Sequence, residues 1–288
     1  MIDEPEDSAV FDEATFTVSY MVSDPATGEA AIIDPVLDFD PKAGRTGTHS
    51  ADAILEAARS QKLTIKTILE THAHADHLSA ASYLKQKSGA AIAIGEHITK
   101  VQKVFRPIFH ADDVVGDGKP FDKLLSDGEH FNIGKLDVEV LYTPGHTPAC
   151  VSYKIGDDVF VGDTLFMPDY GTARADFPGG DARTLYRSIQ KLLALPPETT
   201  LWMCHDYKAP GRNEFAWKTT VAEERARNIH VHDGVGEDDF VAMRTARDKT
   251  LTMPVLILPS VQVNIRAGQM PPPEDDGKVY LKLPVNAL

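Results

Sequence analysis

The run of residues 71–77, with the sequence THAHADH, constrains this chain of 288 residues more than any other feature. Three of its side chains are histidines and one is an aspartate, and imidazole and carboxylate groups are common metal ligands. The preceding run, Ile65–Glu70, is rich in β-branched residues and predicts a strand that leads directly into the cluster. Four ligand-type side chains at the end of a strand predict a metal site.

Backbone geometry suggests how these four side chains are arranged. Side chains two residues apart on an extended chain point to the same side, so His72 and His74 can face one centre. Asp76 and His77 fall where we expect the chain to turn into a helix over His77–Gln86, so they can face a second position nearby. The alanines between them are small and let the imidazoles approach one another.

Three later side chains complete the set, and each of them follows a predicted strand. His146 lies after Leu136–Tyr142, which alternates apolar and polar residues. Asp163 lies after Asp158–Val161, and His205 directly follows Thr200–Cys204. Strand ends can converge on one edge of a sheet sandwich, where loops carry function. We therefore expect all of these residues to meet at one edge.

The order of predicted elements indicates the fold class. Strands come first, helices and strands then alternate, strands return, and helices follow, which favours an α/β fold with an αββα sandwich. In this arrangement two mixed sheets are flanked by helices. We expect one domain over residues 1–288, with a helical or irregular C-terminal part from about residue 210. Further predicted elements are strands at 15–22, 29–33, 90–94 and 151–155, helices at 51–59, 183–195, 213–228 and 237–247, and an irregular stretch with one helical turn from about 97 to 128.

Composition excludes several classes of protein. The formal net charge of −14 repels phosphate backbones, so we expect no nucleic-acid partner. No apolar run approaches 18 residues, so no membrane partner is expected. The first ten residues, MIDEPEDSAV, lack the features of a secretory or transit signal, and the only cysteines are Cys150 and Cys204. These observations predict a cytoplasmic protein with reduced thiols.

Four motifs together resemble the metallo-β-lactamase fold superfamily over about residues 15–210. They are THAHADH, PGHT at 144–147, GDTLF at 162–166 and CHDY at 204–207. Within this superfamily the chain resembles the persulfide dioxygenases, also called sulfur dioxygenases. That finer resemblance rests on GTARADF at 171–177, on CHDY with VAEERARN at 221–228, and on PSVQVNIRAG at 259–268.

The resemblance implies a non-heme Fe(II) persulfide dioxygenase. One Fe(II) per chain would be held by His72, His146 and Asp163, a set of two histidines and one carboxylate that leaves positions open for a sulfur substrate and O₂. Glutathione persulfide, O₂ and water would give sulfite and glutathione, a reaction of sulfide detoxification. The remaining ligand-type residues would orient these ligands or form a second metal site, which zinc could also occupy; they are His74, Asp76, His77 and His205.

Two residues are predicted to contact the substrate. Arg174 suits the carboxylates of glutathione, either as a clamp or as an ion pair with Asp176 that organises the pocket. Tyr207 follows His205 closely and is expected to line the same mouth. The sequence leaves open whether the protein forms a homodimer.

The alternative function is that of a glyoxalase II-like hydroxyacylglutathione hydrolase with a dinuclear metal site bridged by Asp163. We favour the dioxygenase here, because the step from His146 to Asp163 is short and the GTARADF element fits that family better. A non-catalytic metal-binding protein and a β-lactam hydrolase on the same scaffold are further alternatives.

Overall fold

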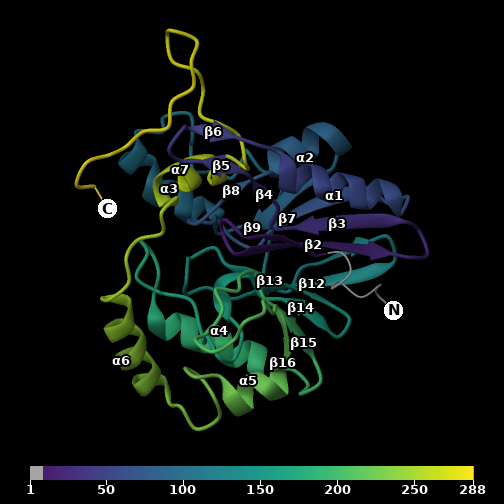
Figure 1. Cartoon of the computed structure of the whole chain (residues 1–288), viewed down its shortest axis with the longest axis vertical. Coiled ribbons are helices and arrows are strands. Elements are labelled where there is room, and N and C mark those ends of the chain that lie inside the picture. Colours follow the sequence, from purple (N-terminus) through teal and green to yellow (C-terminus); the bar gives the residue numbers. More distant parts are fainter. Residues whose placement is uncertain (1–8, 288) are drawn as a thin grey trace.

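The computed structural model describes residues 9–287 and shows two six-stranded sheets packed face to face, with helices outside both (Figure 1). The predicted αββα sandwich is confirmed. No helix within these residues is both long enough and apolar enough to cross a membrane.

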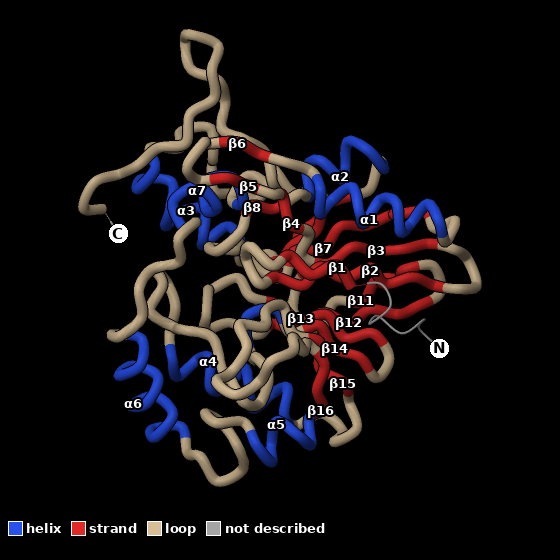
Figure 2. Tube along the Cα trace, in the orientation of Figure 1, coloured by secondary structure: helices blue, strands red, loops and turns tan. Residues whose placement is uncertain are grey.

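The first sheet is mixed. Its strands β1 to β3 pair antiparallel, and β3, β7, β9 and β10 pair parallel. In spatial order the strands are β1 (Ala9–Asp12), β2 (Thr17–Asp24), β3 (Glu29–Ile33), β7 (Thr64–Glu70), β9 (Ala91–Gly95) and β10 (Lys123–Leu125). The helices on its outer side are α1 (His49–Ser60), α2 (Ala81–Ser88), α3 (Ile98–Phe109) and α7 (Ile257–Asn264) (Figure 2).

The second sheet is antiparallel except where β14 and β15 pair parallel. Its strands, in spatial order, are β11 (His130–Ile133), β12 (Leu136–Tyr142), β13 (Val151–Ile155), β14 (Asp158–Phe160), β15 (Thr200–Trp202) and β16 (Lys218–Thr220). Its outer helices are α4 (Ala182–Leu193), α5 (Val221–Arg227) and α6 (Glu237–Asp248). The short elements are β4 (Val36–Leu37) with β8 (Leu78–Ser79), β5 (Phe39–Asp40) with β6 (Arg45–Thr46), and the 3₁₀ turn at Gly162–Thr164.

Three apolar layers hold these elements together. In β2, Tyr20 and Val22 point into the layer between the two sheets, whereas Met21 points outward to the helices of the first sheet. This alternation is what a strand buried on both faces requires. The third layer packs the second sheet against α4 to α6. The sandwich is therefore a rigid frame for the loops at its edges.

Three predicted elements are wrong. The stretch 97–128 contains α3, whose buried Ile98, Val101, Phe105 and Phe109 follow helical spacing. Pro107 and the surrounding Asp and Gly residues hid this pattern; the proline removes one backbone hydrogen bond in the last turn, and the helix ends two residues later at Phe109.

The expected helix over 213–228 begins only at Val221, capped by the Thr220 hydroxyl, and β16 precedes it. Residues 77–86 do not form one helix, because β8 comes first and α2 begins at Ala81. The loop from Thr71 to His77 is consequently irregular, which matters for the site.

Candidate metal centre

The predicted ligands meet at one edge of the sandwich, where strands of both sheets end. The loop after β7 brings residues 71–77 from the first sheet. The second sheet contributes His146 after β12, Asp163 in the turn after β14, and His205 after β15. All of the histidines in this set are buried.

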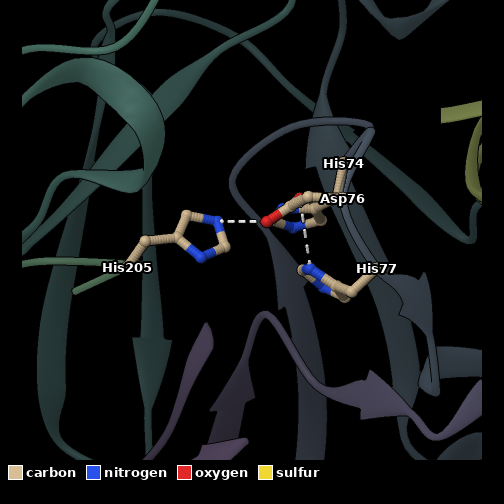
Figure 3. Close-up of side chains that lie close together, drawn as sticks. All are labelled: His74, Asp76, His77 and His205. Atoms are coloured by element: carbon tan, nitrogen blue, oxygen red, sulfur yellow. Dashed lines mark ion pairs between the residues drawn. The ribbon is translucent and has the colours of Figure 1, made fainter. Parts of the chain in front are cut away.

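The donor atoms form two adjacent clusters. One joins His72, His146 and Asp163, and the other joins His74, Asp76, His77 and His205; within each cluster the donor atoms lie within 4.8 Å of one another. Figure 3 shows the second cluster, with His205 on the opposite side from His74, Asp76 and His77 and its ring facing Asp76. The rings of His72 and His74 are 4.0 Å apart, yet they fall in different clusters, so the expectation that both face one centre is only partly met.

Asp163 connects the two clusters. Its Oδ2 lies 3.6 Å from His146 Nε2 and 3.8 Å from His72 Nε2. Its Oδ1 lies 3.3 Å from His205 Nε2 in the other cluster. One carboxylate therefore presents an oxygen to each group.

In four of the histidines, the ring nitrogen that points away from the centre contacts a polar group of the protein. His146 Nδ1 donates to the Arg174 carbonyl at 2.8 Å, and His205 Nδ1 lies 3.2 Å from the Phe16 carbonyl. His72 Nδ1 lies 3.0 Å from the Thr71 hydroxyl, and His77 Nδ1 lies 3.3 Å from that of Thr17. Such contacts fix the ring orientation and leave the other nitrogen free to bind a metal.

The inner atoms are those that a metal would need. Among the described residues, these buried atoms make no hydrogen bond: His72 Nε2, His74 Nδ1, Asp76 Oδ2, His77 Nε2, Asp163 Oδ1 and His205 Nε2. His205 Nε2 lies 3.0 Å from Asp76 Oδ2, but without the geometry of a hydrogen bond. Buried polar atoms are rarely left unpaired. Their convergence fits a centre that binds cations.

The electrostatics agree with this interpretation. Burial and the neighbouring His74 lower the pKa of His72 and of His77, so both rings are neutral and can donate a lone pair. Burial opposes ionisation of Asp76, but His205 and His77 outweigh it and hold the pKa of that carboxyl well below its usual range. His72 and His77 thus offer neutral imidazoles beside the Asp76 carboxylate, as metal binding requires.

Sequence reasoning missed the acidic pair behind His74. His74 Nε2 lies 3.0 Å from Asp34 Oδ1 and 3.3 Å from Glu70 Oε2, and both carboxylates are buried. Burial lowers the pKa of His74, but the charge of Asp34 outweighs it and raises that pKa well above its usual range. Asp34 also accepts from the backbone N–H and the hydroxyl of Thr71 at 2.7 Å. The only sign of this pair in the sequence is that Asp34 directly follows one apolar strand and Glu70 ends another.

A cavity of about 870 Å³ opens onto the centre. Asp76, His146 and Asp163 lie in its wall, and the rest is largely apolar and aromatic. The hairpin of β5 and β6 forms one side and residues 251–256 form another. This size and character suit an organic substrate rather than a bare ion.

Both predicted substrate residues line this cavity. Arg174 makes two hydrogen bonds to Asp176, at 2.6 and 2.8 Å, and a third at 2.7 Å to the Thr252 carbonyl. Its guanidinium therefore ties residues 251–256 to the cavity wall. Tyr207 stacks on the His205 ring with centroids 5.5 Å apart, and burial raises its pKa well above the usual range.

The two cysteines are free thiols buried beside the centre. Cys204 Sγ lies 3.5 Å from Asp34 Oδ2, and Cys150 contacts the backbone and side chain of Thr147. Burial raises the pKa of Cys150 to about 12 and that of Cys204 well above its usual value. Without a metal both thiols are therefore protonated, and Cys204 Sγ lies within 4.8 Å of donor atoms of Asp163 and His205.

Comparison with known proteins places the chain among metallo-enzymes. Residues 13–205 match the family described as the Metallo-beta-lactamase superfamily. A "probable metallo-hydrolase" of Burkholderia pseudomallei is 56% identical over 96% of this chain and 98% of its own length. "Glyoxylase B2" of Dictyostelium discoideum is 50% identical over 94% of each chain. A "beta-lactamase hydrolase-like protein" of Xylella fastidiosa is 53% identical over all of this chain, which spans 66% of that protein.

Solved structures show the same fold. The structure of ETHE1 from Myxococcus xanthus has a TM-score of 0.73 and 31% identity, covering 91% of this chain and 98% of its own. The protein TTHA1623, solved in a di-iron-bound form, has a TM-score of 0.57 and 25% identity over 77% of this chain and 98% of its own. The likeness to the superfamily and to the persulfide dioxygenases is confirmed.

The predicted function of an iron-dependent persulfide dioxygenase is nevertheless wrong. Relatives at 50–56% identity over nearly the full chain bear the names of a metallo-hydrolase and of Glyoxylase B2, whereas human mitochondrial persulfide dioxygenase is only 28% identical. The prediction rested on motifs that support the metal ligands rather than contact the substrate. One of them is GTARADF, in which the Arg174 carbonyl accepts a hydrogen bond from His146 Nδ1. Residues that support metal ligands do not determine which of two reactions is catalysed on the same fold. What the motifs, the fold and the comparisons agree on is that the chain belongs to the Metallo-beta-lactamase superfamily.

Proposed function

We propose that this protein is a metal-dependent thioesterase of the glyoxalase II type, which hydrolyses hydroxyacyl thioesters of glutathione with two divalent cations. The observation that carries the proposal is the place of Asp163, with one carboxylate oxygen toward each cluster of donors. A centre for a single iron needs only one such cluster. The names of the relatives at 50–56% identity support a hydrolase as well.

The proposed ligands follow from the free atoms of the two clusters. One cation would be held by His72, His146 and Asp163 Oδ2. The other would be held by the second cluster together with Asp163 Oδ1, and its members are His74, Asp76, His77 and His205. Imidazole and carboxylate donors suit zinc and iron alike, so the donor set does not choose between them.

The reaction breaks the thioester C–S bond and forms a C–O bond to water, giving a hydroxy acid and the thiol of glutathione. When bound, the cations supply Lewis acidity, which polarises the carbonyl and lowers the pKa of water. The chain supplies the rest. Its histidines are oriented by Arg174, Phe16 and Thr17, and the cavity walls hold the substrate against the centre and exclude bulk water.

The cavity also offers groups for the two carboxylates of glutathione. Arg45 and Arg247 are exposed and lie in its wall, on the β6 side and at the end of α6. We propose that they attract these carboxylates, whereas Arg174 shapes the wall through Asp176 and Thr252. Tyr207 would pack against the bound thioester beside His205.

The proposal is tested by elemental analysis and by hydrolysis of S-lactoylglutathione, followed as release of free thiol. We expect about two divalent cations per chain and thiol release that continues without O₂. The same assay on protein stripped with a chelator should lose activity and regain it when the metal is returned. One cation per chain together with no thiol release would refute the proposal.

A further inference from the structure

The loop over residues 71–77 carries four of the proposed metal donors, and some of its buried backbone carbonyls lack a partner in regular secondary structure. Residues 71–77 are irregular, and helix α2 begins only at Ala81, so the carbonyls of His74 and His77 have no helical partner. Both residues are fully buried. A buried carbonyl without a hydrogen bond is destabilising, so these two must be satisfied by something else.

That partner is a single side chain far away in the sequence. Asn264 Nδ2 donates to the carbonyls of His74 and His77, each at 2.8 Å. Its Oδ1 accepts from the backbone N–H of Ser79, also at 2.8 Å. The side chain is only 4% exposed, and exchanging its oxygen and nitrogen would set the oxygen against two carbonyls. The amide orientation is thus fixed.

Asn264 is held rigidly at the end of α7. Gln102 of α3 donates to the Ile265 carbonyl at 3.0 Å, and Arg266 pairs with Asp113 through two contacts of 2.6 Å. Gly268 lies so close to the end of β8 that a Cβ there would be 2.8 Å from the Ser79 carbonyl oxygen. Helix α7 and the residues after it therefore pack against β8 and the start of α2, directly after the donor loop, and hold Asn264 in place.

We propose that Asn264 is a positioning residue of the metal centre: it clamps the backbone of His74 and His77, which sets the approach of their rings to the second cluster. The residue lies outside the part of the chain that matches the superfamily, residues 13–205. The inference rests on the metal binding in the proposed function and is independent of the substrate. Helix α7 would then help to position the metal ligands through Asn264.

The test uses Co²⁺ titrated into the metal-free full-length protein against a competing chelator. Asn264→Ala removes the clamp but leaves room for a water, and Asn264→Leu keeps the branched shape, is somewhat larger and excludes water. Groups behind metal ligands typically contribute about 10–100-fold to affinity. We expect Co²⁺ affinity to fall about 10-fold or more in the alanine variant and further in the leucine variant, with an altered visible spectrum. Ser260→Ala is the matched control, because Ser260 is buried in the same helix and its Oγ makes no hydrogen bond among the described residues.

The outcomes separate the two claims. Failure of the wild-type protein to bind Co²⁺ would overturn both the metal assignment and the inference. Wild-type affinity and an unchanged spectrum in whichever Asn264 variant folds would overturn the inference alone. A loss of affinity in Ser260→Ala equal to that in Asn264→Ala would also overturn it, since the effect would then come from the helix in general.

Discussion

At the scale of single residues, the two aspartates of the centre are not equivalent. Asp163 has an oxygen toward each cluster, whereas Asp76 belongs only to the second. Replacing Asp163 by alanine should therefore weaken both metal positions, and replacing Asp76 should weaken one. We expect Asp163→Ala to bind fewer than one cation per chain, and Asp76→Ala to retain about one. Elemental analysis after dialysis measures this directly.

Turnover gives the matching comparison. Because the reaction is proposed to need both cations, either substitution should lower kcat/KM for S-lactoylglutathione by more than about 100-fold. The substitutions would then differ in metal content but not in activity. Equal metal content in the two variants would contradict the bridging position of Asp163.

At the scale of elements, prediction worked where one local rule decided the structure. The strand Leu136–Tyr142 was predicted to the residue because it alternates cleanly between two environments. The residues predicted as ligands each follow a strand end, and the structure brings them together at one edge. The conformation of the loop at 71–77 could not be predicted, because its partner Asn264 lies about 190 residues away. The reaction could not be predicted, because the motifs cover the metal ligands and the residues that support them. Both candidate enzyme families share these residues.

Helix α5 offers a prediction about pH. Glu224 is fully buried there, Asn228 Nδ2 donates to its Oε2 at 2.6 Å, and burial raises its pKa to about 8. The unfolded chain releases this proton above its ordinary pKa of about 4.5, while the folded chain keeps it until about pH 8. Stability is thus lost as pH rises through this window. Glu224→Gln should remove that dependence, so the difference in Tm between variant and wild type should grow by roughly 3 °C per pH unit between pH 6 and 8.

The control is the neighbouring Glu223, which is exposed on the same helix. The charge of Glu223 contributes to the raised pKa of Glu224, so Glu223→Gln should move the window to slightly lower pH but keep the loss of stability with rising pH, in thermal melts followed by circular dichroism. A constant offset between Glu224→Gln and the wild type would show that Glu224 is ionised in the folded protein.

At the scale of the whole molecule, the centre links the two halves of the sandwich. One sheet supplies the donors of the 71–77 loop, and the other supplies His146, Asp163 and His205. Bound cations would therefore cross-link the two sheets through donor atoms that otherwise make no hydrogen bond among the described residues. A ligand that binds only the folded state at about 1,000 times its Kd adds about 4 kcal/mol of stability. For a chain of this size we expect a chelator to lower Tm by about 10 °C. Calorimetry with and without metal measures the shift, and Asp163→Ala should show little of it. An unchanged Tm after complete metal removal would mean that the two halves are held by the apolar layer alone, and that the centre forms without help from the cations.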